Sequence, residues 1–421
     1  MTRSLAYRKV GGRIRAPASK SSMQRALACA ALAEGESLIR SPSRSADCLA
    51  ALGAARSLGA AVEGSGDAVS IRGLSRDAMR DTTRRRISCG ESGLCIRMFA
   101  PVAALFGGET ELEAEGTLRR RPVRMIEAPL IQLGAACSTA DGLPPVKVRG
   151  PLIGGRAIVD GRESSQLLTG LLVALPLAER DSLLAVEGLA SKGYVDLTLD
   201  TMRAFGVEAE RDADFREFRV RGGQAYRPAD FRIEGDWSGA AFLLVAAAIS
   251  SAESLEVEGL EPGSAQPDRA ILEALRLCGA EVEASPDIIR VRRGSLSAFS
   301  FDATDCPDLF PPLVALAVAC DGRTEIRGAS RLSGKESDRA TALREEFAAL
   351  GASVEFNGDL MTIRGGMPLA GGRVDSRGDH RLAMAAAIAS LRCKNPVDIV
   401  GAECVAKSWP SFFEDLARIA S

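Results

Sequence analysis

Leu58-Gly59-Ala60 is the first of five copies of a short signature, and this repetition decides the fold of the 421-residue chain. The later copies are Leu133-Gly134-Ala135, Phe205-Gly206-Val207, Cys278-Gly279-Ala280 and Leu350-Gly351-Ala352. Their glycines are spaced 75, 72, 73 and 72 residues apart. Each glycine stands where a left-handed residue ends a helix, and in most copies alternating residues ending in Arg-Gly follow. The signature therefore predicts a helix, a turn and two strands, repeated along the chain.

A second helical segment also recurs, and because it is apolar almost all round it predicts a buried helix. Its six copies are Met23–Leu32, Leu94–Leu105, Leu167–Leu177, Ala240–Ile249, Leu309–Ala319 and Leu382–Leu391. A polar cluster precedes each copy, and for any one cluster alone, N-capping by serine or aspartate is the simpler interpretation. Six clusters in register favour another interpretation. Converging helix N-termini concentrate free N–H groups and partial positive charge, which suits an anionic ligand.

Six βαβαββ-type units in one chain predict an α/β (α+β) fold of two domains with three units each. The helices should lie inside and the sheets face solvent, as in an inside-out α/β barrel. We place the first domain at residues 15–229. The strand-like segment Leu5–Arg13 precedes the first repeat and belongs with the second half, so the second domain is discontinuous and comprises residues 1–14 plus 230–421.

The composition narrows the class of protein. Lys and Arg (53) nearly balance Asp and Glu (55), which argues against a nucleic-acid or membrane-surface protein held by bulk charge. The longest apolar runs are too short to span a bilayer, so we expect a cytoplasmic protein. Ten cysteines without a Cys-x-x-Cys pair predict reduced, core-filling side chains. The single histidine, His380, excludes a multi-histidine metal site, and we expect no metal or organic cofactor.

Several charged segments are candidates for binding anions. Lys20 begins the first buried helix, with Arg25 about one turn inside. A solvated lysine and a snorkelling arginine, neither of which binds a ligand, would give the same sequence pattern. Arg121 ends a run of three arginines, which by itself is typical of a solvated turn. Lys335 and Arg339 should share a helix face at i,i+4 and repel one another without an anion, the alternative being an ordinary surface helix.

Taken in order, these segments resemble the EPSP synthase family of enolpyruvyl transferases from end to end, across all six repeats. Its Lys-Ser-x-x-x-Arg motif corresponds to Lys20, Ser21 and Arg25, and its Lys-Glu-x-Asp-Arg motif to Lys335, Glu336 and Arg339. The resemblance implies a shikimate 3-phosphate site made by Lys20, Ser21, Arg25, Ser164, Ser165, Gln166, Ser191, Asp308 and Lys335. It implies a phosphoenolpyruvate site made by Lys20, Gly93, Arg121, Gln166, Arg339, Arg381 and Lys407. Supporting roles are implied for Arg97, Tyr194 and His380.

The resemblance also implies the chemistry. The family moves the enolpyruvyl group of phosphoenolpyruvate to the 5-hydroxyl of shikimate 3-phosphate, in chorismate and aromatic amino-acid biosynthesis, and is the target of glyphosate. Asp308 and Glu336, with Lys20, are the implied catalytic groups, because addition and elimination need proton transfer in both directions. Since the implied ligands divide between the two halves of the chain, we expect an enzyme that closes on its substrates. We expect it to be a monomer.

Two departures and two rival functions qualify the resemblance. Where many members have asparagine, this chain has Glu91 and Arg331, and Leu94 and Met98 also differ from the common pattern.

The sister transferase that acts on UDP-N-acetylglucosamine usually carries Lys-Asn in the first motif and a reactive cysteine in a loop that lies here between Gly107 and Ala136. This stretch holds no cysteine. A non-catalytic phosphate-binding scaffold of the same fold predicts loss of the candidate carboxylates or arginines, and all of them are present.

Overall fold

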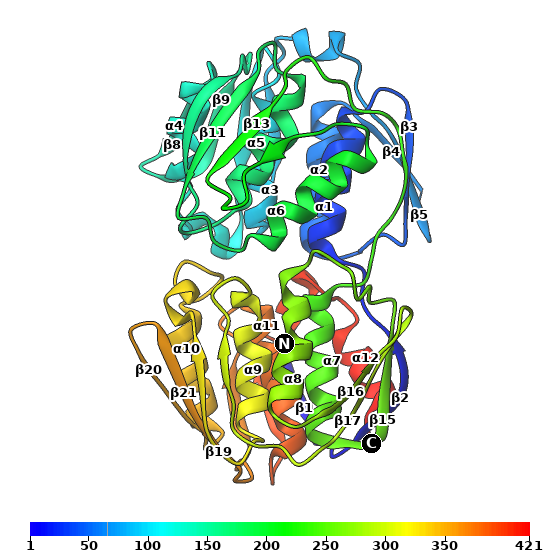
Figure 1. The fold of residues 1–421 in the computed structure, drawn as a ribbon, viewed down its shortest axis with the longest axis vertical. Coiled ribbons are helices and arrows are strands. Elements are labelled where there is room, and N and C mark those ends of the chain that lie inside the picture. The colour runs from blue at the N-terminus through cyan, green and yellow to red at the C-terminus, as the bar shows by residue number, and fades with distance from the viewer. Residues whose placement is uncertain (65) are drawn as a thin grey trace. The chain divides into compact units, whose positions relative to one another are not determined.

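The computed structural model describes residues 1–64 and 66–421, and the chain divides into two compact units (Figure 1). Unit 1 comprises Met1–Pro17 and Glu234–Ser421, and unit 2 comprises Ala18–Ile233. Each unit contains three sheets and six α-helices among the described residues, and each has its own hydrophobic core. Among these residues, no helix has both the length and the apolar character needed to cross a membrane.

Unit 2 contains three four-stranded sheets, with strand orders β14-β3-β5-β4, β6-β7-β9-β8 and β10-β11-β13-β12. Its strands are β3 (Glu36–Arg40), β4 (Ala61–Glu63), β5 (Ala68–Arg72), β6 (Arg85–Ser88), β7 (Glu109–Glu113), β8 (Ala136–Ala140), β9 (Leu143–Arg149), β10 (Gly155–Asp160), β11 (Ser182–Glu187), β12 (Glu210–Arg211), β13 (Glu217–Val220) and β14 (Asp230–Arg232). Its helices are α1 (Lys20–Leu32), α2 (Ala46–Leu58), α3 (Gly93–Ala103), α4 (Glu127–Gln132), α5 (Gln166–Ala174) and α6 (Gly193–Ala204). Short 3₁₀ helices are η1 (Asp77–Arg80), η2 (Gly116–Arg120), η3 (Arg124–Ile126) and η4 (Leu175–Leu177).

Unit 1 contains two four-stranded sheets, β16-β17-β15-β2 and β18-β19-β21-β20, and a three-stranded sheet, β1-β23-β22. Its strands are β1 (Thr2–Leu5), β2 (Val10–Arg15), β15 (Ser251–Glu258), β16 (Glu281–Ala284), β17 (Ile288–Arg292), β18 (Ser300–Asp302), β19 (Gly322–Arg327), β20 (Ser353–Asn357), β21 (Leu360–Gly365), β22 (Gly372–Asp375) and β23 (Val397–Val400). Its helices are α7 (Trp237–Ser250), α8 (Ile271–Leu277), α9 (Phe310–Ala317), α10 (Arg339–Ala349), α11 (His380–Ala389) and α12 (Phe412–Ile419). Short 3₁₀ helices are η5 (Pro267–Ala270), η6 (Pro307–Leu309), η7 (Ala329–Leu332), η8 (Ser390–Arg392) and η9 (Ala402–Lys407).

One repeat shows how the sequence signatures become structure. In the second repeat, β6 and β7 are parallel and α3 connects them, whereas β8 and β9 form an antiparallel hairpin that joins β7. All five signature glycines have φ between +80° and +112°, the left-handed conformation predicted for a helix end. The predicted βαβαββ unit and the α/β fold class are therefore confirmed.

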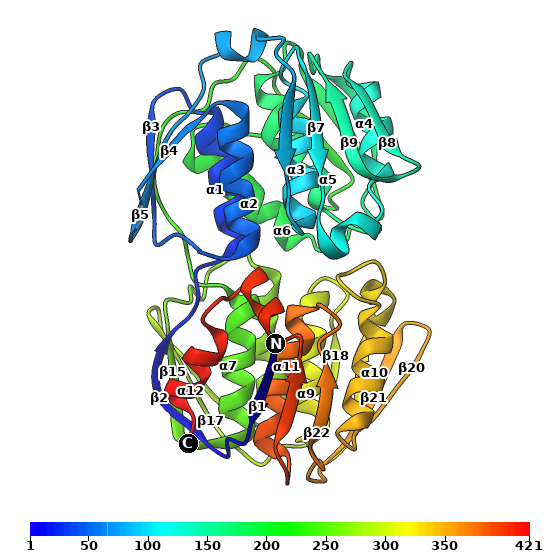
Figure 2. The ribbon, with the colours of Figure 1, turned by 180° about the vertical axis from the view of Figure 1, so that it is seen from behind.

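The recurring apolar helices form the centre of each unit, as predicted. Every residue of α3 is buried, as is every residue of α1 from Ser22 to Leu32. In Figures 1 and 2, α7, α9 and α11 lie together in unit 1 with the sheets around them. In unit 2, alternating burial along β7, where Thr110 and Leu112 are buried, shows that one face of this sheet packs against the core around α3 while the other is more exposed.

Two strands exchange places between the first and fourth repeats. The strand before α1 is β2, but it pairs in parallel with β15 of unit 1, from Ser251↔Val10 to Glu258↔Arg15. The strand before α7 is β14, and it pairs in parallel with β3 of unit 2, from Asp230↔Leu38 to Arg232↔Arg40. Each strand therefore completes the sheet of the other repeat, which makes unit 1 discontinuous in sequence.

Candidate active site

Arg339 is the centre of a charged cluster in unit 1, which we call the unit 1 cluster: Asp308, Lys335, Glu336, Arg339, Asp379, Arg381 and Lys407. The Arg339 side chain is fully buried and donates to three carboxylates. Its Nη1 lies 3.0 Å from Asp308 Oδ1, its Nη2 2.8 Å from Glu336 Oε2, and its Nε 2.9 Å from Asp379 Oδ2. Burial by itself would lower the pKa of Arg339, but Asp379, Glu336 and Asp308 outweigh it and raise the pKa above its ordinary value.

Asp308 has three cationic neighbours in the unit 1 cluster. Besides Arg339, it accepts from Arg381 Nη2 at 3.0 Å, and Lys335 Nζ lies 3.7 Å from its Oδ1. Burial alone would raise the pKa of Asp308, but Arg381, Lys335 and Arg339 reverse the direction and hold the pKa below its ordinary value. The carboxyl group is therefore ionised at neutral pH.

Glu336 and Lys407 occupy the opposite side of Arg339 in this network. Lys407 ends η9, is mostly buried, and places its Nζ 3.7 Å from Glu336 Oε1. Arg381, near the start of α11, also donates through Nη1 to Ser238 Oγ at 2.5 Å. Four cations thus face three carboxylates, which leaves the cluster with a net positive charge.

The spacing of Lys335 and Arg339 predicted one shared helix face, and this prediction is wrong. Helix α10 begins only at Arg339, and Lys335 lies in the preceding turn. Asp338 caps α10, since its Oδ1 accepts from Thr341 N, so the helix cannot include the lysine. Both cations nevertheless reach Asp308 Oδ1.

Asp379 belongs to the cluster and Ser238 contacts it through Arg381, although the sequence analysis did not single them out as site residues. Asp379 is completely buried, caps α11 by accepting from Arg381 N at 3.0 Å, and accepts from Arg339 and Ser337. His380 follows it and is also buried, with its Nδ1 3.9 Å from Asp379 Oδ1. An aspartate at a helix cap is the signal that marks Asp379 in the sequence, but the cap alone does not reveal its arginine partner.

Arg25 is a buried arginine of unit 2, with a different set of partners. Its Nε donates to Thr198 Oγ1 at 2.8 Å, and its Nη atoms donate to Ser21 O, Tyr194 O and Thr169 Oγ1. The guanidinium also lies over the Tyr194 ring. All these acceptors are neutral, and across residues 1–64 and 66–421 no carboxylate forms an ion pair with Arg25. Burial lowers the pKa of Arg25 to about 10, so it remains a cation at neutral pH.

Gly93 brings two arginines together at the start of α3. A Cβ atom on this residue would lie 2.8 Å from Arg121 Nη1 and 2.8 Å from Arg97 Nη1, so any larger residue would require the guanidinium groups to shift. Arg97 Nη1 donates to Gln166 Oε1 at 2.8 Å, and Arg97 Nη2 donates to Pro122 O at 2.8 Å. The structure therefore places Gly93, Arg97, Arg121 and Gln166 side by side.

Ser164 and Ser165 lie beside Gln166 of this group, and the other candidate ligands stand at the starts of α1 and α6. Ser164 Oγ accepts from Gln166 N at 3.1 Å, and Ser165 is buried directly before α5. Ser191 is buried and has φ +59°, and its carbonyl oxygen accepts from Tyr194 N as α6 begins. Lys20 starts α1 and pairs with Asp47, at 2.9 Å between Nζ and Oδ2. Asp47 is a partner that the sequence analysis missed; its signal is an acidic residue in the first turn of α2.

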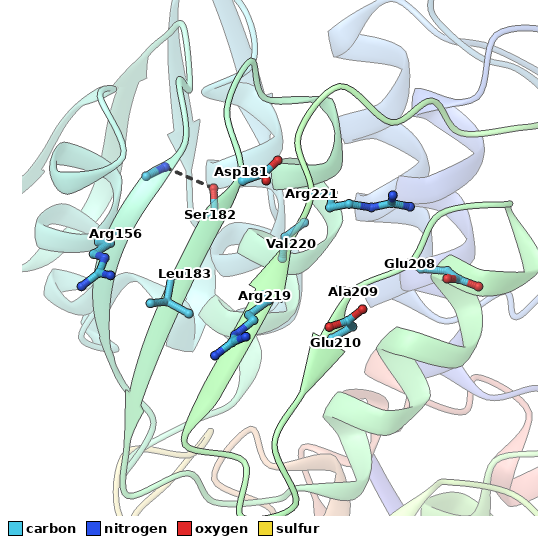
Figure 3. Close-up of a pocket in the computed structure, with 11 residues that line it drawn as sticks. Arg156, Asp181, Ser182, Leu183, Glu208, Ala209, Glu210, Arg219, Val220 and Arg221 are labelled. Atoms are coloured by element: carbon cyan, nitrogen blue, oxygen red, sulfur yellow. Dashed lines mark hydrogen bonds between the residues drawn. The ribbon is translucent and has the colours of Figure 1, made fainter.

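A hollow of about 450 Å³ on unit 2 lies apart from these residues (Figure 3). Figure 3 shows Arg156, Leu183 and Arg219 on neighbouring strands β10, β11 and β13, with Asp181 and Arg221 at one end. Charges of both signs line this open surface, and none of its lining residues is among the candidate site residues.

The whole chain is similar to one protein family. The family model for EPSP synthase (3-phosphoshikimate 1-carboxyvinyltransferase) matches residues 6–416. A 3-phosphoshikimate 1-carboxyvinyltransferase of Halobacterium salinarum is 41% identical over 425 residues, covering 98% of this chain and 97% of the relative. One from Clostridium kluyveri is 39% identical over 412 residues, covering 98% and 95%.

Solved structures agree with the sequence comparison. An EPSP synthase from Acinetobacter baumannii superposes with a TM-score of 0.84 at 26% identity, covering 100% of this chain and 98% of the other. The enolpyruvyl transferase NikO from Streptomyces tendae, at 17% identity, has a TM-score of 0.76 and covers 98% and 96%. The second likeness concerns the fold alone.

Proposed function

This chain belongs to the EPSP synthase (3-phosphoshikimate 1-carboxyvinyltransferase) family, and from this premise we propose which of its residues bind the substrates and transfer protons. The enzyme transfers the enolpyruvyl group of phosphoenolpyruvate to shikimate 3-phosphate, a step of aromatic biosynthesis by the shikimate pathway. Both substrates carry a carboxylate and a phosphate. Their burial requires paired cations, and arginine is the best suited because it binds such groups through two donors.

The binding residues follow from the charges. Shikimate 3-phosphate is assigned to Lys20, Ser21, Arg25, Ser164, Ser165, Gln166, Ser191, Asp308 and Lys335. Phosphoenolpyruvate is assigned to Lys20, Gly93, Arg121, Gln166, Arg339, Arg381 and Lys407. The buried cation of Arg25 supports this assignment, because its neutral partners leave its charge for an anionic ligand to balance. Arg97, Tyr194 and His380 support the site through Gln166, Arg25 and Asp379, respectively.

Asp308 and Glu336 are the proposed proton-transfer groups. In the addition step the 5-hydroxyl oxygen bonds to C2 of phosphoenolpyruvate, its proton passes to a base, and an acid protonates C3. Asp308, which its cations keep ionised, suits the base, and Glu336 then serves C3. In the elimination step the C2–O bond to phosphate breaks, C3 loses a proton and phosphate leaves. Lys20 stabilises charge as the proton donors and acceptors exchange roles.

The single observation that carries the proposal is the convergence of Arg339, Arg381 and Lys335 on the Asp308 carboxylate. Release of phosphate from phosphoenolpyruvate tests it, with shikimate 3-phosphate or UDP-N-acetylglucosamine as acceptor. We expect release with shikimate 3-phosphate only, and its loss in Asp308→Ala. Release with the sugar nucleotide, or an active Asp308→Ala variant, would contradict the proposal.

The remaining proposals concern the domain boundaries, the location, the oligomeric state and the inhibition of the enzyme. We propose that the two domains are residues 15–229 and residues 1–14 plus 230–421, and that the enzyme is a cytoplasmic monomer without nucleic-acid or membrane partners, consistent with its net charge of -2. We also propose that glyphosate inhibits it in competition with phosphoenolpyruvate. Inhibition that does not compete with phosphoenolpyruvate would contradict this site assignment.

A further inference from the structure

Glu91 connects two separate segments of unit 2 through its carboxylate. It lies in the turn before α3, and its Oε2 accepts from Thr117 N at 2.8 Å and from Thr117 Oγ1 at 2.7 Å. Thr117 is the second residue of η2, whose own cap residue Glu115 makes no side-chain capping bond. Glu91 therefore caps η2 from another part of the chain, and a carboxylate is well suited to a helix start.

Gly116 shows how closely this carboxylate is packed. Its φ is +48°, and a Cβ atom built on it would lie 2.3 Å from Glu91 Cδ and 2.5 Å from each carboxylate oxygen. The glutamate side chain thus occupies the space that any other residue at position 116 would need. Two backbone bonds tie the same segments together, from Glu115 N to Gly90 O at 2.8 Å and from Cys89 N to Glu113 O at 2.9 Å.

Arg121 lies at the other end of η2. It follows the last residue of this 3₁₀ helix, and its backbone N–H donates to Leu118 O. Its guanidinium group lies over Gly93, the first residue of α3, two residues after Glu91. The segment from Glu91 to Gly93 therefore contacts both ends of η2, because Glu91 bonds the start and Gly93 leaves room for the arginine at the end.

We propose that Glu91 is a positioning residue that sets the place of Arg121 for phosphoenolpyruvate, through η2 and without touching the substrate. The inference rests on the proposed role of Arg121 as a phosphoenolpyruvate ligand. The essential property of Glu91 is then its acceptor oxygen at Thr117. A glutamine keeps such an oxygen, whereas an alanine removes it.

Steady-state kinetics of Glu91→Ala and Glu91→Gln test the inference. In Glu91→Ala we expect KM for phosphoenolpyruvate to rise about tenfold, while KM for shikimate 3-phosphate and kcat change by less than about 1.5-fold. In Glu91→Gln all three values should stay within about 1.5-fold of the unmodified enzyme. Thr117→Val removes the hydroxyl donor but keeps the backbone N–H, and should raise KM for phosphoenolpyruvate about threefold.

Asp81 provides a matched control in the same unit. Its Oδ1 accepts from Thr83 N at 2.9 Å and from Thr83 Oγ1 at 2.6 Å, the same pair of donors, before β6 rather than after it. Asp81→Ala should therefore leave both KM values unchanged.

The outcomes separate this inference from the function on which it rests. If Arg121→Ala raises KM for phosphoenolpyruvate but Glu91→Ala and Thr117→Val do not, the role of Glu91 is refuted and that of Arg121 stands. If Arg121→Ala leaves this KM unchanged, the proposed ligand role fails and the inference fails with it. Equal rises for both substrates in Glu91→Ala would mean general damage to the site and would overturn the inference. If Glu91→Ala does not fold, Thr117→Val decides, by a rise in KM for phosphoenolpyruvate that KM for shikimate 3-phosphate and kcat do not share.

Discussion

Arg339 in unit 1 and Arg25 in unit 2 are both buried arginines near helix starts, but their partners differ. Arg339 donates to Asp308, Glu336 and Asp379, so its charge is more than balanced. Arg25 donates to two threonine hydroxyls and two carbonyl oxygens. Among the described residues, none of these hydrogen-bond partners carries a negative charge that would balance the arginine. A buried cation is costly unless it is paired, and Arg25 therefore has more to gain from an anionic ligand.

The difference suggests different roles for the candidate residues of the two units. In unit 1 cations pair with the carboxylates, and they keep Asp308 ionised by holding its pKa below its ordinary value. In unit 2 neutral donors and cations predominate among the candidate ligands, which suits recognition of a phosphate. The following experiments are arranged from the largest expected effect to the smallest.

Removal of the unit 1 carboxylates should lower turnover far more than it weakens substrate binding. In Asp308→Ala and Glu336→Gln we expect kcat to fall by about 10²–10⁴, because each loses a proton-transfer group while the cations that pair with the substrates remain. Phosphate release under saturating substrates measures kcat. Glu345→Gln, on the exposed part of α10 where Glu345 pairs with Arg377, is the control and should be fully active. A normal kcat in either test variant would refute the role of that carboxylate.

Replacement of the two buried arginines by methionine should separate the two units by stability. Arg339→Met removes the one cation that three carboxylates share, so the free energy of unfolding should fall by about 3–5 kcal/mol. Arg25→Met removes a cation that has no carboxylate partner, and should cost less than about 1 kcal/mol while weakening shikimate 3-phosphate binding. Urea unfolding without substrates measures both. Equal losses of stability would remove the contrast between the units.

Arginines of both units should contribute to phosphoenolpyruvate binding. Arg121→Ala and Arg381→Ala should each raise KM for phosphoenolpyruvate about 10- to 100-fold, since each leaves buried anionic charge without a partner. Arg156→Ala, on the exposed strand shown in Figure 3, is the control and should not change this KM. An unchanged KM in Arg121→Ala would confine phosphoenolpyruvate recognition to the other proposed ligands.

The smallest effect is expected from a single methyl group at two helix starts. Gly93→Ala places a Cβ against the guanidinium groups of Arg121 and Arg97, whereas Gly239→Ala in α7 meets only carbon atoms of Pro17 and Trp409 and Asp236 Cβ. Because the arginines must move in the first case, KM for phosphoenolpyruvate should rise about fivefold in Gly93→Ala. In Gly239→Ala it should change less than about twofold, which is close to the experimental error of KM. A larger effect at Gly239 would contradict the special role of the Gly93 position.

Much of the fold could be predicted from the sequence, because its signals are local. The left-handed glycines after α2, α4, α6, α8 and α10, and the apolar helices before them, depend on residues within one or two turns. The candidate ligands could be named for a similar reason, since each lies in a short polar segment at a helix start. Their roles remain proposals that the experiments above test.

Contacts between distant segments were decided only by the tertiary structure. The sequence placed Lys335 on a helix, but the Asp338 cap starts α10 later, and the lysine reaches Asp308 from a turn. The pairing of Arg339 with Asp379 spans 40 residues, and that of Lys20 with Asp47 spans 27, so neither follows from local spacing.

The exchange of β2 and β14 has the same origin. Both strands precede a buried helix of the same kind, so the local pattern of either one fits the parallel position beside β3 or beside β15. By itself the sequence determined what recurs, because helix periodicity, glycine conformation and capping act over a few residues. Tertiary structure decided which strand and which charge meet, because those choices depend on how the packed units bury their apolar faces and balance their ions.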